Sequence, residues 1–261
     1  MSTHAKAAAK FLADRERAAW HDRALFHVRE KRDRMAHAVP EWEALRQAAS
    51  EIKLHTLSHL GRYLEEFERN ATANGMVVHW ASDAREMNRI VLDILRRHGG
   101  RTLIKSKSML SEECGLAPFL AGQGIDAVES DLGERIMQLM HRPPSHIVLP
   151  AIHVRREEVG ELFERELGTA RGDSDPTYLT HEARKHLRGK FLTADVAMTG
   201  VNFAVASEGP SQSAPTRATP IWGRRFPICI SRSWGWRRSS PTTVRWRSSP
   251  VCWRVRPRGS P

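Results

Sequence analysis

Short hydrophobic runs alternate with helix-like segments along the first two hundred residues of this chain. The runs that favour strands are residues 76–80, 103–104, 125–128, 147–149 and 196–206. Between the first two, apolar side chains recur at intervals of three and four, the stripe of a helix that covers a sheet; they are Met87, Ile90, Val91, Ile94 and Leu95. Strands separated by helices at this spacing are typical of βαβ units. The pattern therefore predicts an α/β fold with a mostly parallel sheet.

The residues before the first predicted strand favour helices. Residues 3–37 are rich in Ala, Arg, Lys and Glu and predict one long charged helix, which Pro40 interrupts. Two further helices are expected before the turn signal at residues 74–75, and the second of them has an apolar face that includes Leu57 and Phe67.

Two more helices are predicted near the end of the α/β pattern. One covers residues 157–167, and another covers residues 181–192 with Thr180 as its N-terminal cap. The last apolar run is a strand or a pair of strands with Gly200 at a bend.

The character of the chain changes after Glu208. The last 53 residues contain 11 Arg, 9 Ser, 8 Pro and 5 Trp, but no Leu, Lys, Asp or Glu. Frequent prolines oppose both central strands and stable helices. Leucine, the commonest residue in proteins, and both acidic residues are absent together from this segment, which favours an out-of-frame translation. We therefore expect a helical region at residues 1–72, an α/β domain at 73–208 and a disordered tail at 209–261.

The basic excess of the chain lies in this tail. The formal net charge is +11, whereas residues 1–208 carry 30 basic and 30 acidic side chains. An Arg/Trp tail could bind nucleic acid through phosphate contacts and base stacking. The shifted frame explains the composition better, so nucleic acid is not the expected partner.

Neither a membrane span nor a metal site is predicted. No apolar run approaches the roughly 20 residues that cross a bilayer, and the first residues lack a secretory pattern, so we expect a cytoplasmic protein. Cys114, Cys229 and Cys252 have no metal-ligand spacing. His55 and His59 lie four residues apart on a predicted helix, but no third ligand lies nearby.

Polar residues gather where the predicted strands end, which is where ligands bind in open α/β sheets. Lys105, Ser106, Lys107 and Ser108 follow one strand and could present ammonium and hydroxyl donors to a small carboxylate or phosphate. The alternative is a pair of solvated lysines.

Acidic residues follow the next strand in the same way. Glu129, Asp131 and Glu134 could include a general base, because crowded carboxylates have raised pKa values. Alternatively Asp131 caps the helix that follows. His153 lies just past another predicted strand end, and Asn202 could orient a ligand or make a turn.

Seven blocks in the first 208 residues resemble the lactate-utilisation iron–sulfur proteins, whose shared module is the LUD domain. They are WHDRALFHVREKRD (20–33), VPEWEALRQAASEIKLHTLSHL (39–60), NGMVVHWASDAREMNRI (74–90), KSKSMLSEECGL (105–116), ESDLGERIMQL (129–139), PSHIVLPAIH (144–153) and TGVNFAVA (199–206). The resemblance implies a fold similar to ribose-phosphate isomerases and CoA transferases, with helices on both faces of the sheet.

The resemblance also implies a function. Relatives act in multi-subunit systems that oxidise L-lactate to pyruvate through [4Fe–4S] clusters, which they hold on a C-terminal region. A cubane cluster takes four thiolates at short spacing, so we expect no cofactor in this chain. We interpret it as a truncated family member that works with other subunits of a lactate-utilisation complex. A stand-alone isomerase or acyl transferase acting on a small anion is the alternative.

Overall fold

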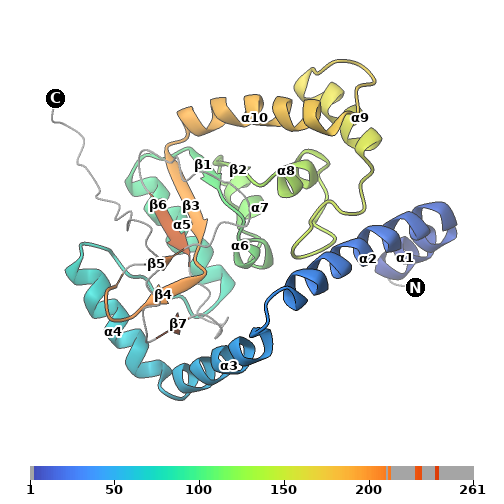
Figure 1. Cartoon of the computed structure of the whole chain (residues 1–261). Helices are drawn as coiled ribbons and strands as arrows, with labels where there is room; N and C mark the ends of the chain where they lie inside the picture. Colours follow the sequence, from blue (N-terminus) through green and yellow to red (C-terminus); the bar gives the residue numbers. More distant parts are fainter. Residues whose placement is uncertain (1–2, 210, 213–226, 231–238, 241–261) are drawn as a thin grey trace.

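The computed structural model describes residues 3–209, 211–212, 227–230 and 239–240 (Figure 1). Its helices and strands follow one another along the chain in this order: α1 Thr3–Ala13, α2 Arg15–His37, α3 Trp42–Ser58, α4 Leu60–Ala73, α5 Ala84–Arg97, β1 Thr102–Lys105, α6 Met109–Glu113, α7 Leu116–Ala121, β2 Asp126–Glu129, α8 Leu132–Leu139, α9 Arg156–Leu167, α10 Pro176–Thr193, β3 Val196–Gly200, β4 Phe203–Val205, β5 Ser211–Gln212, β6 Pro227–Ile230 and β7 Ser239–Ser240.

The main sheet has the strand order β2-β1-β3-β6, and every neighbouring pair in it is parallel. Leu103 of β1 pairs with Ala127 on one side and with Val196 on the other. The chain leaves β1 for β2 at one side and later returns to β3 at the other. The edge of the sheet beyond the ends of β1 and β3 is therefore a topological switch point, the usual place for a ligand in such sheets.

Helices cover both faces of this sheet, as the resemblance implied. On one face α5 and α7 pack against the strands in a hydrophobic core; its buried members are Val91, Leu92, Leu95, Leu103, Leu116, Leu120, Ile125, Ala127, Val196 and Met198. Successive strand residues point to opposite faces, so Ile104 and Val128 point toward the side of α8 and α10. Behind these two helices, α9 joins a second core. The predicted fold class, mostly parallel α/β with an N-terminal helical region, is confirmed.

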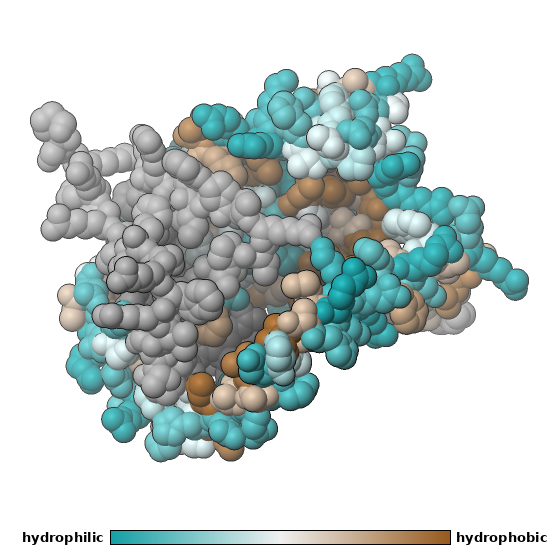
Figure 2. All heavy atoms as spheres, viewed as in Figure 1, coloured by the Kyte–Doolittle hydropathy of each residue, from teal (hydrophilic) through white to brown (hydrophobic). Residues whose placement is uncertain are grey.

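The N-terminal helices differ in detail from the prediction. Residues 3–37 form two helices instead of one, because the Asp14 side chain accepts a hydrogen bond from the Arg17 amide and caps a new helix. The expected apolar helix is likewise divided between α3 and α4 at His59. Hydrophobic side chains stay exposed along α2 and α3, and Figure 2 shows part of this surface; they include Phe26, Met35, Trp42, Leu45 and Leu54.

Two of the predicted strands are wrong. Residues 76–80 pair with none of the described strands, and Val77 is 79% exposed. Residues 147–149 form a loop. The His146 ring nitrogen accepts hydrogen bonds from the amides of Val148 and Leu149, both 3.1 Å long, so these donors are not available to a neighbouring strand.

The helix predicted at residues 181–192 begins earlier, at Pro176, and its cap is Asp175 instead of Thr180. The Asp175 carboxylate accepts a hydrogen bond from the Tyr178 amide, whereas the Thr180 hydroxyl donates to the Pro176 carbonyl inside the helix. Proline is suited to the first helical position, where its missing N–H costs nothing. The predicted pair of strands around Gly200 is confirmed as β3 and β4.

The predicted disorder of residues 209–261 falls mainly outside the described residues. Among those described, the chain forms three short strands where the sequence predicted none: β5 and β7 flank β4, and β6 pairs with β3. Pro227 is the first residue of β6, which is an edge strand of the main sheet. This is a position that tolerates proline, because proline has no N–H to donate to a ladder.

Gly209 ends the body of the fold in close contact with α4. Its φ of +78° lies in the left-handed region, and a Cβ there would come within 2.4 Å of the Ala71 amide nitrogen. The Asn70 and Asn74 side-chain amides donate to the carbonyls of Ala206 and Glu208, which hold the same segment against the helix. Only glycine allows so close an approach in this conformation.

Substituting Gly209 with alanine should therefore destabilise the protein by about 1–3 kcal/mol, through a strained φ and a backbone clash. The matched control is Gly172→Ala, since Gly172 has a φ of +73° with no other atom near the position of a Cβ. Urea denaturation measures both changes. Equal losses in the two variants would mean that the contact with α4 contributes nothing.

Candidate functional site

Two charged residues end neighbouring strands at the switch point. Lys105 is the last residue of β1 and Glu129 the last of β2, and the two are register partners in the parallel pair. Register partners point to the same face of a sheet, so the Lys105 Nζ lies 2.9 Å from the Glu129 Oε1. The sequence placed both residues at strand ends, and the structure brings their side chains into direct contact.

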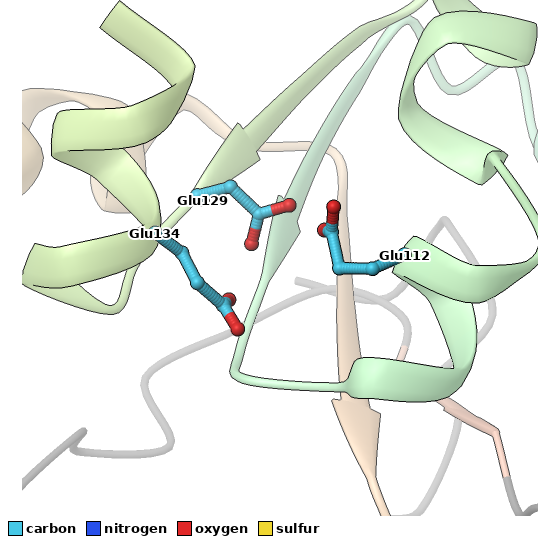
Figure 3. Close-up of side chains that lie close together, drawn as sticks. All are labelled: Glu112, Glu129 and Glu134. Carbon is cyan, nitrogen blue, oxygen red and sulfur yellow. The ribbon is translucent and has the colours of Figure 1, made fainter. Parts of the chain in front are cut away.

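Two further glutamates reach the same point from helices (Figure 3). Glu112 extends from α6 and Glu134 from the first turn of α8. Their carboxylate oxygens lie 3.0 and 3.8 Å from the Lys105 Nζ. We call Lys105, Glu112, Glu129 and Glu134 the Lys105 cluster.

The cluster is buried unevenly. The side chains of Lys105, Glu129 and Glu134 are 1%, 4% and 3% exposed, whereas that of Glu112 is 26% exposed. Lys107 lies at its margin, with its Nζ 4.0 Å from a Glu134 oxygen and its side chain 22% exposed. Solvent therefore reaches the cluster beside Glu112 and Lys107.

Burial and charge shift the pKa values of two members of this cluster, Glu129 and Lys105. Burial raises the pKa of Glu129 to about 9; nearby Glu134 adds to this rise, and the Lys105 ammonium opposes it. Burial alone would lower the pKa of Lys105, but attraction to Glu129, Glu134 and Glu112 outweighs this effect and raises it. At neutral pH we therefore expect a charged lysine beside a neutral Glu129.

Asp131 is not a member of the cluster. Its carboxylate accepts a hydrogen bond from the Glu134 amide, 3.1 Å long, and so caps α8, the alternative role that the sequence left open. The cap fixes the first turn of α8, which carries Glu134.

The loop after β1 is held by contacts with neighbouring segments. Ser106 donates its amide to the Met198 carbonyl of β3, and the Lys107 ammonium donates to the Val148 carbonyl at 3.0 Å. Ser108 is buried and precedes α6. It packs closely against Gly200, since a Cβ added to that glycine would lie 3.3 Å from the Ser108 Cβ. Asn202 lies between β3 and β4. Of the predicted anion-binding residues, Lys105, Ser106, Lys107, Ser108 and Asn202 thus lie at or just after the carboxyl ends of β1 and β3.

His153 contacts a different set of residues. Its Nδ1 shares a 2.6 Å hydrogen bond with the Ser145 hydroxyl, and its carbonyl accepts from Arg17 of α2. Burial, followed by the nearby positive charge of Arg17, lowers its pKa. An open cavity of about 760 Å³ also lies between α2, α8 and the starts of α9 and α10, and no predicted site residue lines it.

Glu112 is a site residue that the sequence analysis missed. It lies seven positions after Lys105, on the short helix α6 that follows the loop after β1, and a strand and a helix share no regular period. Gln138 was missed for the same reason. Its side-chain amide donates to the Ala127 carbonyl, and its oxygen accepts from the Glu129 amide, so it holds the end of β2 against α8.

The cluster has the carboxylates of a metal site but already contains a cation. The oxygens of Glu112, Glu129 and Glu134 come within 4.8 Å of one another, a span that could hold a metal ion. The Lys105 ammonium lies within 3.8 Å of all three carboxylates. An ammonium thus occupies the place where a metal ion would bind.

The cysteines of this chain do not fit an iron–sulfur cluster. The sequence contains three, Cys114, Cys229 and Cys252, whereas a [4Fe–4S] cluster takes four thiolates. Cys114, the one with a described side chain, caps the C-terminus of α6.

Comparisons of the sequence with known proteins identify its family. The model of the LUD domain matches residues 64–211. The chain belongs to the LUD domain family. It is 43% identical over 182 residues to lactate utilization protein B of an Exiguobacterium species, covering 70% of this chain and 38% of that protein. No solved structure matches significantly.

Other relatives carry similar names. Lactate utilization protein B of Geobacillus thermodenitrificans is 43% identical over 169 residues, covering 64% of this LUD chain and 35% of the relative. An uncharacterized electron transport protein of Escherichia coli, YkgF, is 39% identical over 178 residues, covering 68% and 37%. The expected resemblance is confirmed, and the matched region spans less than two fifths of each relative. In the part of the LUD chain that the structure describes, no helix has the length and hydrophobicity to cross a bilayer.

The raised pKa of Glu129 predicts a pH-dependent stability. Between its usual pKa and about 9, the folded chain holds a proton that the unfolded chain releases, so the free energy of unfolding falls as pH rises. The slope approaches about 1.4 kcal/mol per pH unit for one proton. The Glu129→Gln variant should lose this slope, because glutamine does not titrate.

Urea denaturation at a series of pH values measures this dependence. The exposed Glu161 of α9 provides the matched control, and Glu161→Gln should keep the slope. A wild-type slope that persists in Glu129→Gln would assign the proton to another group.

Proposed function

We propose that this chain serves in L-lactate utilisation as a LUD-domain component of an electron-transfer system. The observation that carries the proposal is the sequence identity of about 40% to proteins named lactate utilization protein B. The matched LUD domain, residues 64–211, includes the Lys105 cluster and the switch point of the sheet. The proposed reaction of the whole system is oxidation of L-lactate to pyruvate, with other subunits as partners.

In this proposal the chain contributes a folded scaffold and an anion site, and redox chemistry belongs to partner subunits. Its three cysteines support this division, since they are too few for a [4Fe–4S] cluster. The anion site is the edge formed by Ser106, Lys107 and Ser108, where Lys107 carries a partly exposed ammonium. A small carboxylate is the ligand that this site would take.

We further propose that the residues after Glu208 derive from a shifted reading frame. Their composition supports this, because leucine and every acidic residue disappear together. The nucleotide sequence around codon 209 tests it: a one-base shift should restore leucine, acidic residues and clustered cysteines. An unshifted frame with the same composition would exclude it.

A chimera tests the lactate function. Residues 1–208 of this chain, joined to the remaining part of lactate utilization protein B from Geobacillus thermodenitrificans, should restore growth on L-lactate to a strain lacking that protein. The reason is that this region carries the matched LUD domain. Immunoblotting provides the control that the chimera accumulates in the cells. Accumulation without growth would contradict the proposal.

A second candidate is an isomerase or acyl transferase that acts on a small anion. The observation that favours it is the buried Lys105 cluster at the switch point, where perturbed carboxyl groups are typical of acid–base catalysis. The purified chain should then convert a sugar phosphate or an acyl-CoA, and Glu129→Gln should abolish the turnover. Equal rates in the two proteins would remove this candidate.

A further inference from the structure

Negative groups outnumber positive ones in the buried part of the Lys105 cluster. Three carboxylates surround one ammonium, and Glu129 and Glu134 are both almost completely buried. Three of their oxygens, Glu129 Oε2 and both oxygens of Glu134, accept no hydrogen bond from the described residues. A buried carboxylate oxygen without a donor is costly, so these oxygens indicate a missing donor.

A proton is the donor that fits this position. A metal ion would need the place that the Lys105 ammonium already occupies. One proton on Glu129 removes the excess negative charge of this buried part and supplies an O–H that can donate to Glu134, which has a carboxylate oxygen within 4.8 Å of one of Glu129. Two carboxyl groups that share one proton are the expected outcome when like charges are held together in a buried site.

The groups that face Glu129 come from four segments. Lys105 lies on β1, Glu112 on α6 and Glu134 on α8, and Lys107 follows β1 at the solvent margin. Arg135 of α8 interacts with Glu129 through its charge. Of these groups, Lys105, Glu129 and Glu134 are almost completely buried, and with Glu129 neutral the Lys105 ammonium and the Glu134 carboxylate balance each other.

Lys107 and the carboxyl pair lie close enough to bind one small molecule together. The Lys107 Nζ is 4.0 Å from Glu134, and it now donates to the Val148 carbonyl, which a ligand carboxylate could replace. A charge-assisted hydrogen bond to a carboxylate is stronger than one to a neutral carbonyl. A second oxygen on the adjacent carbon of that ligand would then point toward the buried acid.

We propose that Glu129 is a buried carboxylic acid that donates a hydrogen bond to the second oxygen of a 2-oxo or 2-hydroxy monocarboxylate, whose carboxylate pairs with Lys107. The ligand class rests on the proposed lactate function, whereas the protonated acid rests on the geometry of the cluster alone. On binding, the O–H of Glu129 turns from Glu134 to the ligand, and no covalent bond changes.

Infrared spectroscopy of the purified full chain tests the acid. At neutral pH the spectrum should contain the C=O stretch of a buried protonated carboxyl, and this band should disappear as the pH rises past about 9. The band should be absent in Glu129→Gln, whose amide has the shape of the neutral acid, and present in Glu161→Gln. Absence of the band from the wild type would overturn the proposal.

The same band tests the ligand. Pyruvate and L-lactate should shift it, whereas acetate, which lacks the second oxygen, and inorganic phosphate should not. Lys107→Met should keep the band and weaken the pyruvate effect about tenfold or more, the loss expected for one charge-assisted hydrogen bond. A band that neither pyruvate nor lactate shifts would make the proton purely structural and overturn the ligand assignment.

These outcomes are separable from those of the growth experiment. If the chimera fails to restore growth but the band responds to pyruvate, the lactate function is wrong and the site stands. If growth is restored while the band is absent, the acid site is wrong and the function stands.

Discussion

The Lys105 ammonium is the charge around which the carboxyl edge of the sheet is built. It is buried at the end of the central strand β1, and its three carboxylate partners come from β2, α6 and α8. Removing one partner from a buried ion pair is strongly destabilising, because the remaining charge stays out of water without compensation. The positions of α6 and α8 relative to the sheet are therefore coupled to this one group.

Contacts between loops reinforce the same edge. The Lys107 ammonium joins the loop after β1 to residue 148, and a Cβ on Gly133 of α8 would lie 3.2 Å from the Pro150 ring of that second loop. Gly200 at the end of β3 packs in the same way against Lys107 and Ser108. Backbone that approaches so closely leaves few alternative arrangements, which keeps the side chains of the site in fixed positions.

The prediction of the fold succeeded where local pattern and packing agree. The helix expected before β1 forms as α5, Ala84–Arg97, because its apolar stripe has a sheet to cover. It failed at residues 76–80 and 147–149, which have strand-like composition but pair with none of the described strands. Strand formation depends on a partner strand that may be distant in the sequence, so composition alone overpredicts strands.

By itself the sequence determined the α/β class, the strand ends on which Lys105 and Glu129 lie, and the change of composition after Glu208. These are properties of short segments, and hydrophobic period and residue type express them directly. Only the tertiary structure decided that Glu112 and Glu134 join Lys105, that Asp131 is a helix cap, and that β6 lies beside β3. The reason is that charges act over a few ångströms in space, and the sequence does not record which distant segments the packing of helices on the sheet brings within that range.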